Sequence, residues 1–320
     1  MKRNRWMHGL VTAALLGAGV VVAALPAEGQ KAPAAGAESQ YIGSEACANC
    51  HQAPYEQFRQ TAMGKIFLLN PRTPQERQGC EACHGPGRAH ADAKGKLKVF
   101  MFGKDSLHPV DEQNLQCLEC HEKGNRMFWR GSQHESRGLA CVTCHQVHQR
   151  AAPQVGSARF LEPLTENHQF VKTTQMEVCF QCHQMRRAQL QRSAHMPVRE
   201  GKVTCANCHN PHGTPYPKLL KTATTNETCY GCHAERRGTF LWEHPPVMEN
   251  CLNCHEPHGS NNPQLLVMRA PRLCERCHVA SFHPSTPQPL TSIRNFNRAC
   301  TNCHSNVHGS NHPSGFMWHR

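Results

Sequence analysis

The hydrophobic residues of this 320-residue chain are concentrated near its beginning. A run from Gly9 to Leu25 consists mainly of Leu, Val and Ala, and it follows the basic segment 2–5. This pattern is typical of a secretory signal, which we assign to residues 1–29 with an approximate cleavage point. An uncleaved membrane anchor is the alternative, but the run is slightly short for a helix that spans a bilayer.

After this leader the pattern predicts little regular structure. Hydrophobic residues make up only 38% of the chain, mean hydropathy is −0.60, and 22 Pro and 23 Gly interrupt helix and strand patterns. We predict a flexible linker over residues 30–41, followed by mostly irregular coil with short α-helices and little β structure. A chain of this length normally buries an apolar core, so a group other than side chains must fill the interior.

The cysteines indicate what that group is. All 20 cysteines fall into ten Cys-x-x-Cys pairs, and each pair is followed directly by His. The cysteines are Cys47, Cys50, Cys80, Cys83, Cys117, Cys120, Cys141, Cys144, Cys179, Cys182, Cys205, Cys208, Cys229, Cys232, Cys251, Cys254, Cys274, Cys277, Cys300 and Cys303. The histidines that follow them are His51, His84, His121, His145, His183, His209, His233, His255, His278 and His304.

Cys-x-x-Cys-His is the attachment motif of c-type haem. Two thiols add to the two vinyl groups of one porphyrin, and the next residue delivers an imidazole to the iron as the proximal ligand. Zinc sites and thiol redox motifs also use Cys-x-x-Cys, but they do not require His at that position in every copy. We therefore predict ten covalent haem c groups with iron, and a multihaem cytochrome c wrapped round an elongated row of ten haems.

The positive charge of the chain fits this cofactor. The formal net charge is +12, and it falls to +10 when the leader is removed. The propionates of ten haems offset this excess, because Lys and Arg pair readily with carboxylates. The basic balance therefore gives no reason to expect nucleic acid as a partner.

The motifs recur in pairs, which predicts five two-haem repeats within a decahaem domain at 42–320. The repeats cover roughly 42–110, 111–155, 156–222, 223–268 and 269–320. The nearly identical sequences of residues 208–213 and 254–259 support this division.

Further residues at repeated spacings are candidates for the distal iron ligand. They are Met63, His90, His134, His148, His195, His212, His244, His258, His283, His308 and His312. A His three residues after a proximal His cannot reach the same iron, so His148, His212 and His258 should serve neighbouring haems. Ligation of each iron by two histidines leaves no open position, which favours electron transfer over catalysis. The spacing does not pair each ligand with a haem.

Met63 stands twelve residues after His51, where the next three repeats have His. It is a candidate distal ligand for the first haem, and Met raises the potential relative to a second His. Otherwise Met63 is a packing residue, and the first iron takes His312, His108 or His90.

Several of these segments resemble the periplasmic decahaem cytochromes of the MtrA, DmsE and PioA type. The similarity covers about residues 42–316 and includes the segments at 80–86, 139–148, 192–195, 241–244 and 307–315. It implies an exported protein of the periplasm, associated with the outer membrane through a porin-like β-barrel partner. It also implies periplasmic or inner-membrane cytochromes as electron donors, and an outer-surface multihaem cytochrome or reductase as a further partner. The chain is more distantly similar to pentahaem donors of nitrite reductase.

The resulting hypothesis is an electron-transfer protein rather than an enzyme. It would carry electrons between the periplasm and the cell exterior, for respiration on extracellular acceptors or oxidation of extracellular donors. The alternatives are a soluble periplasmic electron shuttle or store, a multihaem reductase for nitrite or hydroxylamine, and a filament-forming cytochrome.

Overall fold

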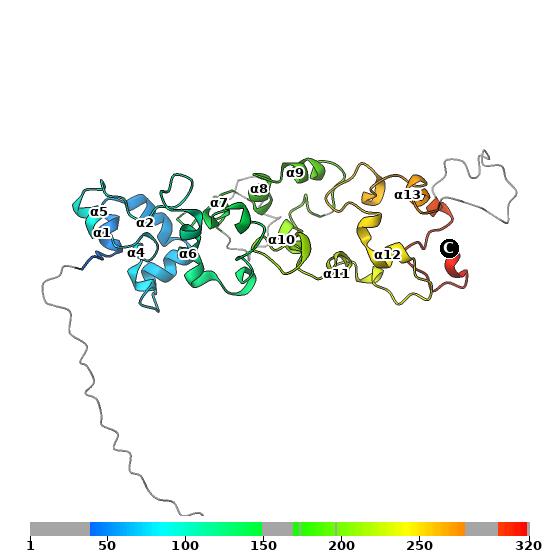
Figure 1. The fold of residues 1–320 in the computed structure, drawn as a ribbon, viewed down its shortest axis with the longest axis horizontal. Coiled ribbons are helices and arrows are strands. Elements are labelled where there is room, and N and C mark those ends of the chain that lie inside the picture. The colour runs from blue at the N-terminus through cyan, green and yellow to red at the C-terminus, as the bar shows by residue number, and fades with distance from the viewer. Residues whose placement is uncertain (1–38, 149–168, 173, 196, 279–299, 319–320) are drawn as a thin grey trace, which may run out of the picture. The chain divides into compact units, whose positions relative to one another are not determined.

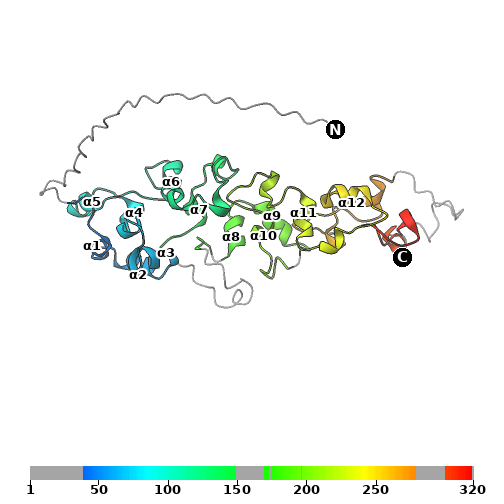
Figure 2. The ribbon, with the colours of Figure 1, turned by 90° about the horizontal axis from the view of Figure 1, so that it is seen from below.

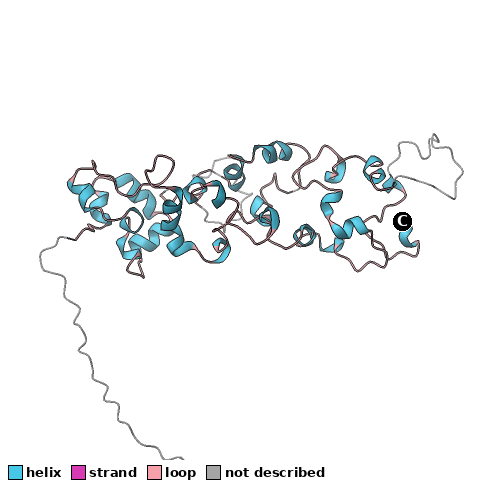
Figure 3. Cartoon of the chain, in the orientation of Figure 1, coloured by secondary structure: helices cyan, strands magenta, loops and turns pink. Residues whose placement is uncertain are grey.

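The computed structural model describes residues 39–148, 169–172, 174–195, 197–278 and 300–318 (Figure 1). Short helices joined by turns dominate these residues, and no β-sheet occurs among them (Figure 3). Single β-bridges join a few loops, such as His209 with Leu220 and His255 with Leu266. The prediction of short helices with little β structure is confirmed over these ranges. The leader predicted for 1–29 lies outside them.

The α-helices are all short, and the longest among the described residues is α6. They are α1 (Ser44–Ala48), α2 (Gln52–Arg59), α3 (Ala62–Gly64), α4 (Glu81–His84), α5 (Arg88–Asp92), α6 (Val110–His121), α7 (Cys141–Cys144), α8 (Gln175–Phe180), α9 (Gln184–Leu190), α10 (Cys205–Cys208), α11 (Thr225–Tyr230), α12 (Pro245–Glu249) and α13 (Arg272–Glu275).

Single turns of other helix types connect them. These are the π-helix η1 (Lys65–Leu69) and the 3₁₀-helices η2 (Glu76–Gln78), η3 (Gly124–Arg126), η4 (Glu135–Arg137), η5 (Pro217–Leu219), η6 (Ala234–Arg236), η7 (Cys251–Asn253), η8 (Pro263–Leu265), η9 (Cys300–Asn302) and η10 (Gly315–Met317).

Threonine caps begin two of the helices that carry a first motif cysteine. Thr174 accepts a hydrogen bond from the Glu177 amide, and the Glu177 side chain accepts one from the Thr174 amide, which forms a capping box on α8. Thr224 accepts from the Glu227 amide at the start of α11 in the same way. These caps satisfy amide groups that a helix of six residues cannot pair internally.

Thr174→Ala should therefore loosen α8. The free energy of unfolding of the haem-loaded protein should fall by about 1 kcal/mol, the usual cost of losing a threonine cap. Denaturant titration of the variant and the natural protein measures this difference. Thr174→Ser keeps the hydroxyl and should retain most of the stability, and an equal loss in both variants would contradict the role of the cap.

Side chains alone form very little apolar core. The buried hydrophobic residues in the described ranges are Phe58, Leu118, Trp129, Ala140, Val178 and Leu190. No helix among these ranges is long and apolar enough to cross a membrane. A chain that orders itself with so few buried side chains fits the prediction that a prosthetic group supplies the interior.

The helices of each motif pair lie next to one another. α6 lies beside α7, and α8 lies beside α10, in both views of the chain (Figures 1 and 2). Residues 40–320 form one compact unit. The attachment motifs thus follow one another in space within this unit, and the site is built from their contacts.

Candidate haem-binding sites

Each attachment motif forms one turn of helix. The amide of the motif histidine donates a hydrogen bond to the carbonyl of the first cysteine, as between His51 and Cys47 at 2.9 Å and between His233 and Cys229 at 2.8 Å. Residues separated by three or four positions share one face of such a turn. The turn therefore presents two thiols and one imidazole on the same side, which is the arrangement that covalent haem attachment requires.

Within a motif pair, the first cysteines meet. The thiol of Cys80 accepts a hydrogen bond from Cys47, which lowers the pKa of Cys80 to about 6 and raises that of Cys47. A hydrogen bond from Cys179 likewise lowers the pKa of Cys205 to about 7. The same contact joins Cys117 with Cys141, Cys229 with Cys251, and Cys274 with Cys300. All 20 cysteines are nevertheless free of disulfide bonds.

Between motif pairs, the second cysteines are neighbours. Burial, and after it the nearby Cys120 thiol, raises the pKa of Cys83 to about 11. Equivalent neighbours are Cys144 with Cys182, Cys208 with Cys232, and Cys254 with Cys277. The ten motifs thus form an unbranched series in chain order, in which the two kinds of contact alternate.

Eight motif histidines face a second histidine. In each pair the ring centroids are 5.9 to 6.3 Å apart. The pairs are His51 with His90, His84 with His148, His183 with His134, His145 with His212, His233 with His195, His209 with His258, His278 with His244, and His255 with His308. Two nitrogens that each lie about 2 Å from one metal place their ring centroids roughly 6 Å apart. The spacing therefore suits an iron between the two rings.

Backbone carbonyls orient many of these rings through Nδ1. The Nδ1 of His84 lies 2.7 Å from the Phe100 carbonyl, and that of His134 lies 2.7 Å from the Pro211 carbonyl. The other contacts of this kind are His90 with Leu97, His209 with Lys218, His244 with Val307, His255 with Gln264, and His304 with Met317. A donated Nδ1 proton leaves the Nε2 lone pair for the metal, as is usual for ligating histidines.

Two of these carbonyls belong to residues in the left-handed region of backbone conformation. Lys218 has a φ of 58° and Gln264 a φ of 51°, and each is the residue whose carbonyl faces a motif histidine. Non-glycine residues in this region cost free energy and persist where the surrounding structure requires them. The repeat thus places the same strained turn behind His209 and His255.

Burial keeps several of the rings in the neutral form. Desolvation lowers the pKa of four of these histidines, namely His148, His244, His258 and His308. Only an imidazole with a free lone pair binds iron. At His258 the carboxylate of Glu256 acts in the opposite direction, because its Oε1 lies 2.9 Å from the ring Nδ1 and raises the pKa, but burial has the larger effect and the pKa is lowered.

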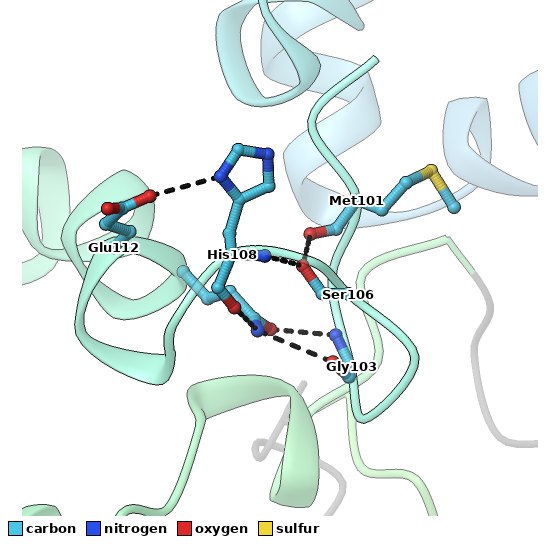
Figure 4. Close-up of polar contacts among 6 residues, drawn as sticks. Met101, Gly103, Ser106, His108 and Glu112 are labelled. Atoms are coloured by element: carbon cyan, nitrogen blue, oxygen red, sulfur yellow. Dashed lines mark hydrogen bonds and ion pairs between the residues drawn. The ribbon is translucent and has the colours of Figure 1, made fainter. Parts of the chain in front are cut away.

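The remaining candidates lie elsewhere. His283 is outside the described residues. His312 contacts the Ser314 hydroxyl through Nδ1, at 3.0 Å. His108 points its Nδ1 at Glu112 (Figure 4). Its ring packs on that of Phe100, with centroids 4.0 Å apart. Among the described residues, eight motif histidines therefore face a second histidine ring. His121 and His304 are not among these eight.

Of the candidates for the first motif, His90 is the one whose ring lies beside it. His90, six residues after His84, faces His51 with ring centroids 5.9 Å apart. The spacing from one motif to the next candidate did not reveal this, because a candidate ring faces a motif in another part of the chain. A regularity among the later repeats does show it, because His134, His195 and His244 each face the first motif histidine of the next repeat.

These attachment turns and facing histidines define a class of protein, the multihaem c-type cytochromes. A model of the doubled CXXCH motif matches residues 195–238 and 244–281, and a model of the NrfB-like c-type cytochromes matches residues 80–162. The multihaem cytochrome MtrA of Shewanella baltica is 40% identical over 296 residues, which cover 89% of this chain and 84% of that protein. The chain belongs to the MtrA family of multihaem cytochromes. It is accordingly a haem-binding electron-transfer protein and not an enzyme.

Two further relatives are more distant. The cytochrome c-type protein NrfB of Escherichia coli is 26% identical over 186 residues, which cover 55% of this chain and 87% of that protein. NrfB of Haemophilus influenzae is 26% identical over 182 residues, covering 48% of this chain and 78% of that protein. The similarity to NrfB thus extends over about half of the chain.

Proposed function

We propose that the chain binds ten haem c groups and carries electrons between the periplasm and the cell exterior within an outer-membrane β-barrel partner. The observation that carries this proposal is the unbranched series of motif contacts, which runs from Cys47 to Cys300 through alternating cysteine neighbours. The 40% identity to MtrA over 89% of the chain supports it.

When bound, each haem supplies an iron that accepts and releases one electron. The two cysteines of each motif would hold the group, and the motif histidine would be its proximal ligand. The facing histidines would be the distal ligands, namely His90, His134, His148, His195, His212, His244, His258 and His308. Carbonyl contacts at Nδ1 fix the ring orientations, so that little reorganisation accompanies a change of charge.

The cysteine contacts position the groups for transfer from one to the next. Each thiol pair, such as Cys117 with Cys141, brings the attachment edges of two sites together. Where a motif histidine and its facing histidine would both bind the iron, no position would remain for a substrate, and this would favour a conduit over a reductase of nitrite or hydroxylamine. We further propose that residues 1–29 direct export and that the mature protein resides in the periplasm, attached to the outer membrane through its partner.

Purification of the native protein in detergent tests this function. We expect a chain mass increased by ten haems and a β-barrel protein that copurifies with it. Free monomer in the periplasmic fraction, with no barrel, would contradict the conduit and favour a soluble shuttle. Rapid binding of nitrite or carbon monoxide by the isolated protein would instead indicate an open iron position and a reductase.

A further inference from the structure

Three repeats share one local arrangement around a candidate ligand. A buried apolar residue lies five positions before the candidate, and a hydroxyl residue lies two positions before it. The buried residues are Phe58, Trp129 and Leu190, which are 6 to 7% exposed. The hydroxyl residues are Thr61, Ser132 and Ser193, and the candidates are Met63, His134 and His195. Met63 thus occupies in the first repeat the position that histidine holds in the next two.

The hydroxyl makes the same hydrogen bond in the first two repeats. Thr61 Oγ1 accepts from the Gly64 amide at 2.9 Å, and Ser132 Oγ accepts from the Glu135 amide at 3.1 Å. In both cases the bond spans three residues and encloses the candidate ligand. The backbone on both sides of Met63 is tightly packed. Thr61 is fully buried, and a Cβ on Gly64 would lie 1.8 Å from the Phe58 carbonyl oxygen.

In the first two repeats the buried residue packs its ring against the same kind of partner. The ring of Phe58 lies 5.9 Å from that of His148, and the ring of Trp129 lies 6.4 Å from that of His212. In the third repeat, the backbone of Leu190 lies beside Gly259, which follows His258. These partner histidines each lie three residues after a motif histidine. The first repeat therefore contacts its successor in the same way as the second and third repeats do.

Each junction between later repeats is joined by two reciprocal ring pairs. At the second junction, His134 faces His183 of the next repeat, and His212 faces back to His145. At the third, His195 faces His233, and His258 faces back to His209. His244 and His308 do the same at the fourth junction, toward His278 and His255.

The first junction has its backward pair, because His148 faces His84. At the other junctions, the candidate ligand of one repeat faces the first motif histidine of the next repeat. The equivalent pair at the first junction joins position 63 to His121. The chain that follows Met63 reaches this motif, since Gln75 Nε2 donates to Glu119 Oε2 at 3.1 Å. Cys120 also donates to the Gln75 side-chain oxygen, at 3.6 Å.

Two rival assignments do not fit this geometry. His51 already faces His90, so the first motif has a histidine where Met63 would otherwise bind. His108 precedes the first turn of α6 and His121 ends that helix. The helix has 12 residues, so its ends are separated by roughly 16 Å at 1.5 Å per residue. His108 is therefore too far from His121 to share an iron with it.

We propose that the Met63 sulfur is the distal ligand of the haem held by Cys117, Cys120 and His121. This inference rests on the proposed binding of haem at that motif. A thioether donates less electron density to ferric iron than a second imidazole, so His/Met ligation raises the reduction potential. The third site in the series thus has a higher potential than sites with two histidines, and it holds an electron more strongly than its neighbours.

Spectroscopy of the haem-loaded protein tests the ligand. The ferric protein should show the weak sulfur-to-iron charge-transfer band at the red end of the visible spectrum. Met63→His should abolish this band and lower the highest potential found in a redox titration, while the haem content stays unchanged. Met63→Leu should convert one iron to a high-spin form that binds carbon monoxide. Met127→Leu, which replaces an exposed methionine of the second repeat, should leave all these signals unchanged.

A second set of measurements locates the ligand. Cys117→Ala with Cys120→Ala should abolish the band, and Cys47→Ala with Cys50→Ala should retain it. The opposite result would overturn the assignment. If either variant fails to fold, a crystal structure of the natural haem-loaded protein decides, since the Met63 sulfur must then bind the iron opposite His121. Ten haems without the band would refute only the Met63 assignment, whereas fewer than ten haems would refute the proposed function.

Discussion

Cys205→Ala combined with Cys208→Ala is expected to remove one haem and to interrupt electron transfer from one end of the series to the other. The motif is internal, so its cysteines contact Cys179 on one side and Cys232 on the other. His209 also faces His258 of the next repeat, with ring centroids 6.2 Å apart. Loss of this site should destabilise both neighbouring sites, because a bound metal group contributes directly to folding free energy.

The matched control removes the last motif, by Cys300→Ala with Cys303→Ala. Its first cysteine contacts Cys274, and it stands at one end of the series of motif contacts. Mass spectrometry should find nine haems in this control, with transfer among the other sites intact. The internal variant should lose transfer between reductant and acceptor in a reconstituted membrane assay. A stable nine-haem internal variant with unchanged end-to-end transfer would contradict a single serial path.

Gly259→Ala is expected to have the second large effect. Gly259 has a φ of +136°, and a Cβ there would lie 2.1 Å from the Gln189 carbonyl oxygen. Alanine therefore adds backbone strain and an overlap with backbone that cannot move aside, which together cost about 3 kcal/mol. The neighbouring His258 should also be displaced from His209.

Gly124→Ala is the control for this variant. Gly124 has a φ of +64°, but no atom lies within 4 Å of an added Cβ. It should show only the strain of the left-handed conformation, about 1 kcal/mol. Denaturant titration gives the two losses of stability, and electron paramagnetic resonance should detect a high-spin iron in Gly259→Ala alone. Equal losses and unchanged spectra in both variants would contradict the role of the close approach.

The sequence predicted the chemistry of these sites better than their pairing. The attachment motif is local, since one helical turn carries both thiols and the imidazole, and five residues suffice to recognise it. The short helices, and the lack of a sheet in the part of the chain that the structure describes, also agree with the composition. These features depend on neighbours in the chain, which a sequence displays directly.

The pairing depends on contacts between distant residues. His134 faces His183, 49 positions later, and His308 faces back to His255. Spacing within one repeat could not show whether a ligand belongs to its own repeat or to the next. This is why the spacing leaves both Met63 and His90 as candidates for the first motif, whereas the facing rings at the later junctions indicate which motif each ligand serves.

The reciprocal ring pairs also bear on how the protein is made. His84 precedes His148 by 64 positions, so its facing ring is synthesised only after most of the second repeat. In the proposed haem attachment, the coordination of a repeat would therefore be complete only once its successor is present. We expect maturation to advance by whole repeats, with one incompletely ligated iron at the growing boundary. By the same geometry, a repeat inserted at any of the last three junctions would restore both ring pairs that it interrupts, so a chain of this design would lengthen by steps of two motifs.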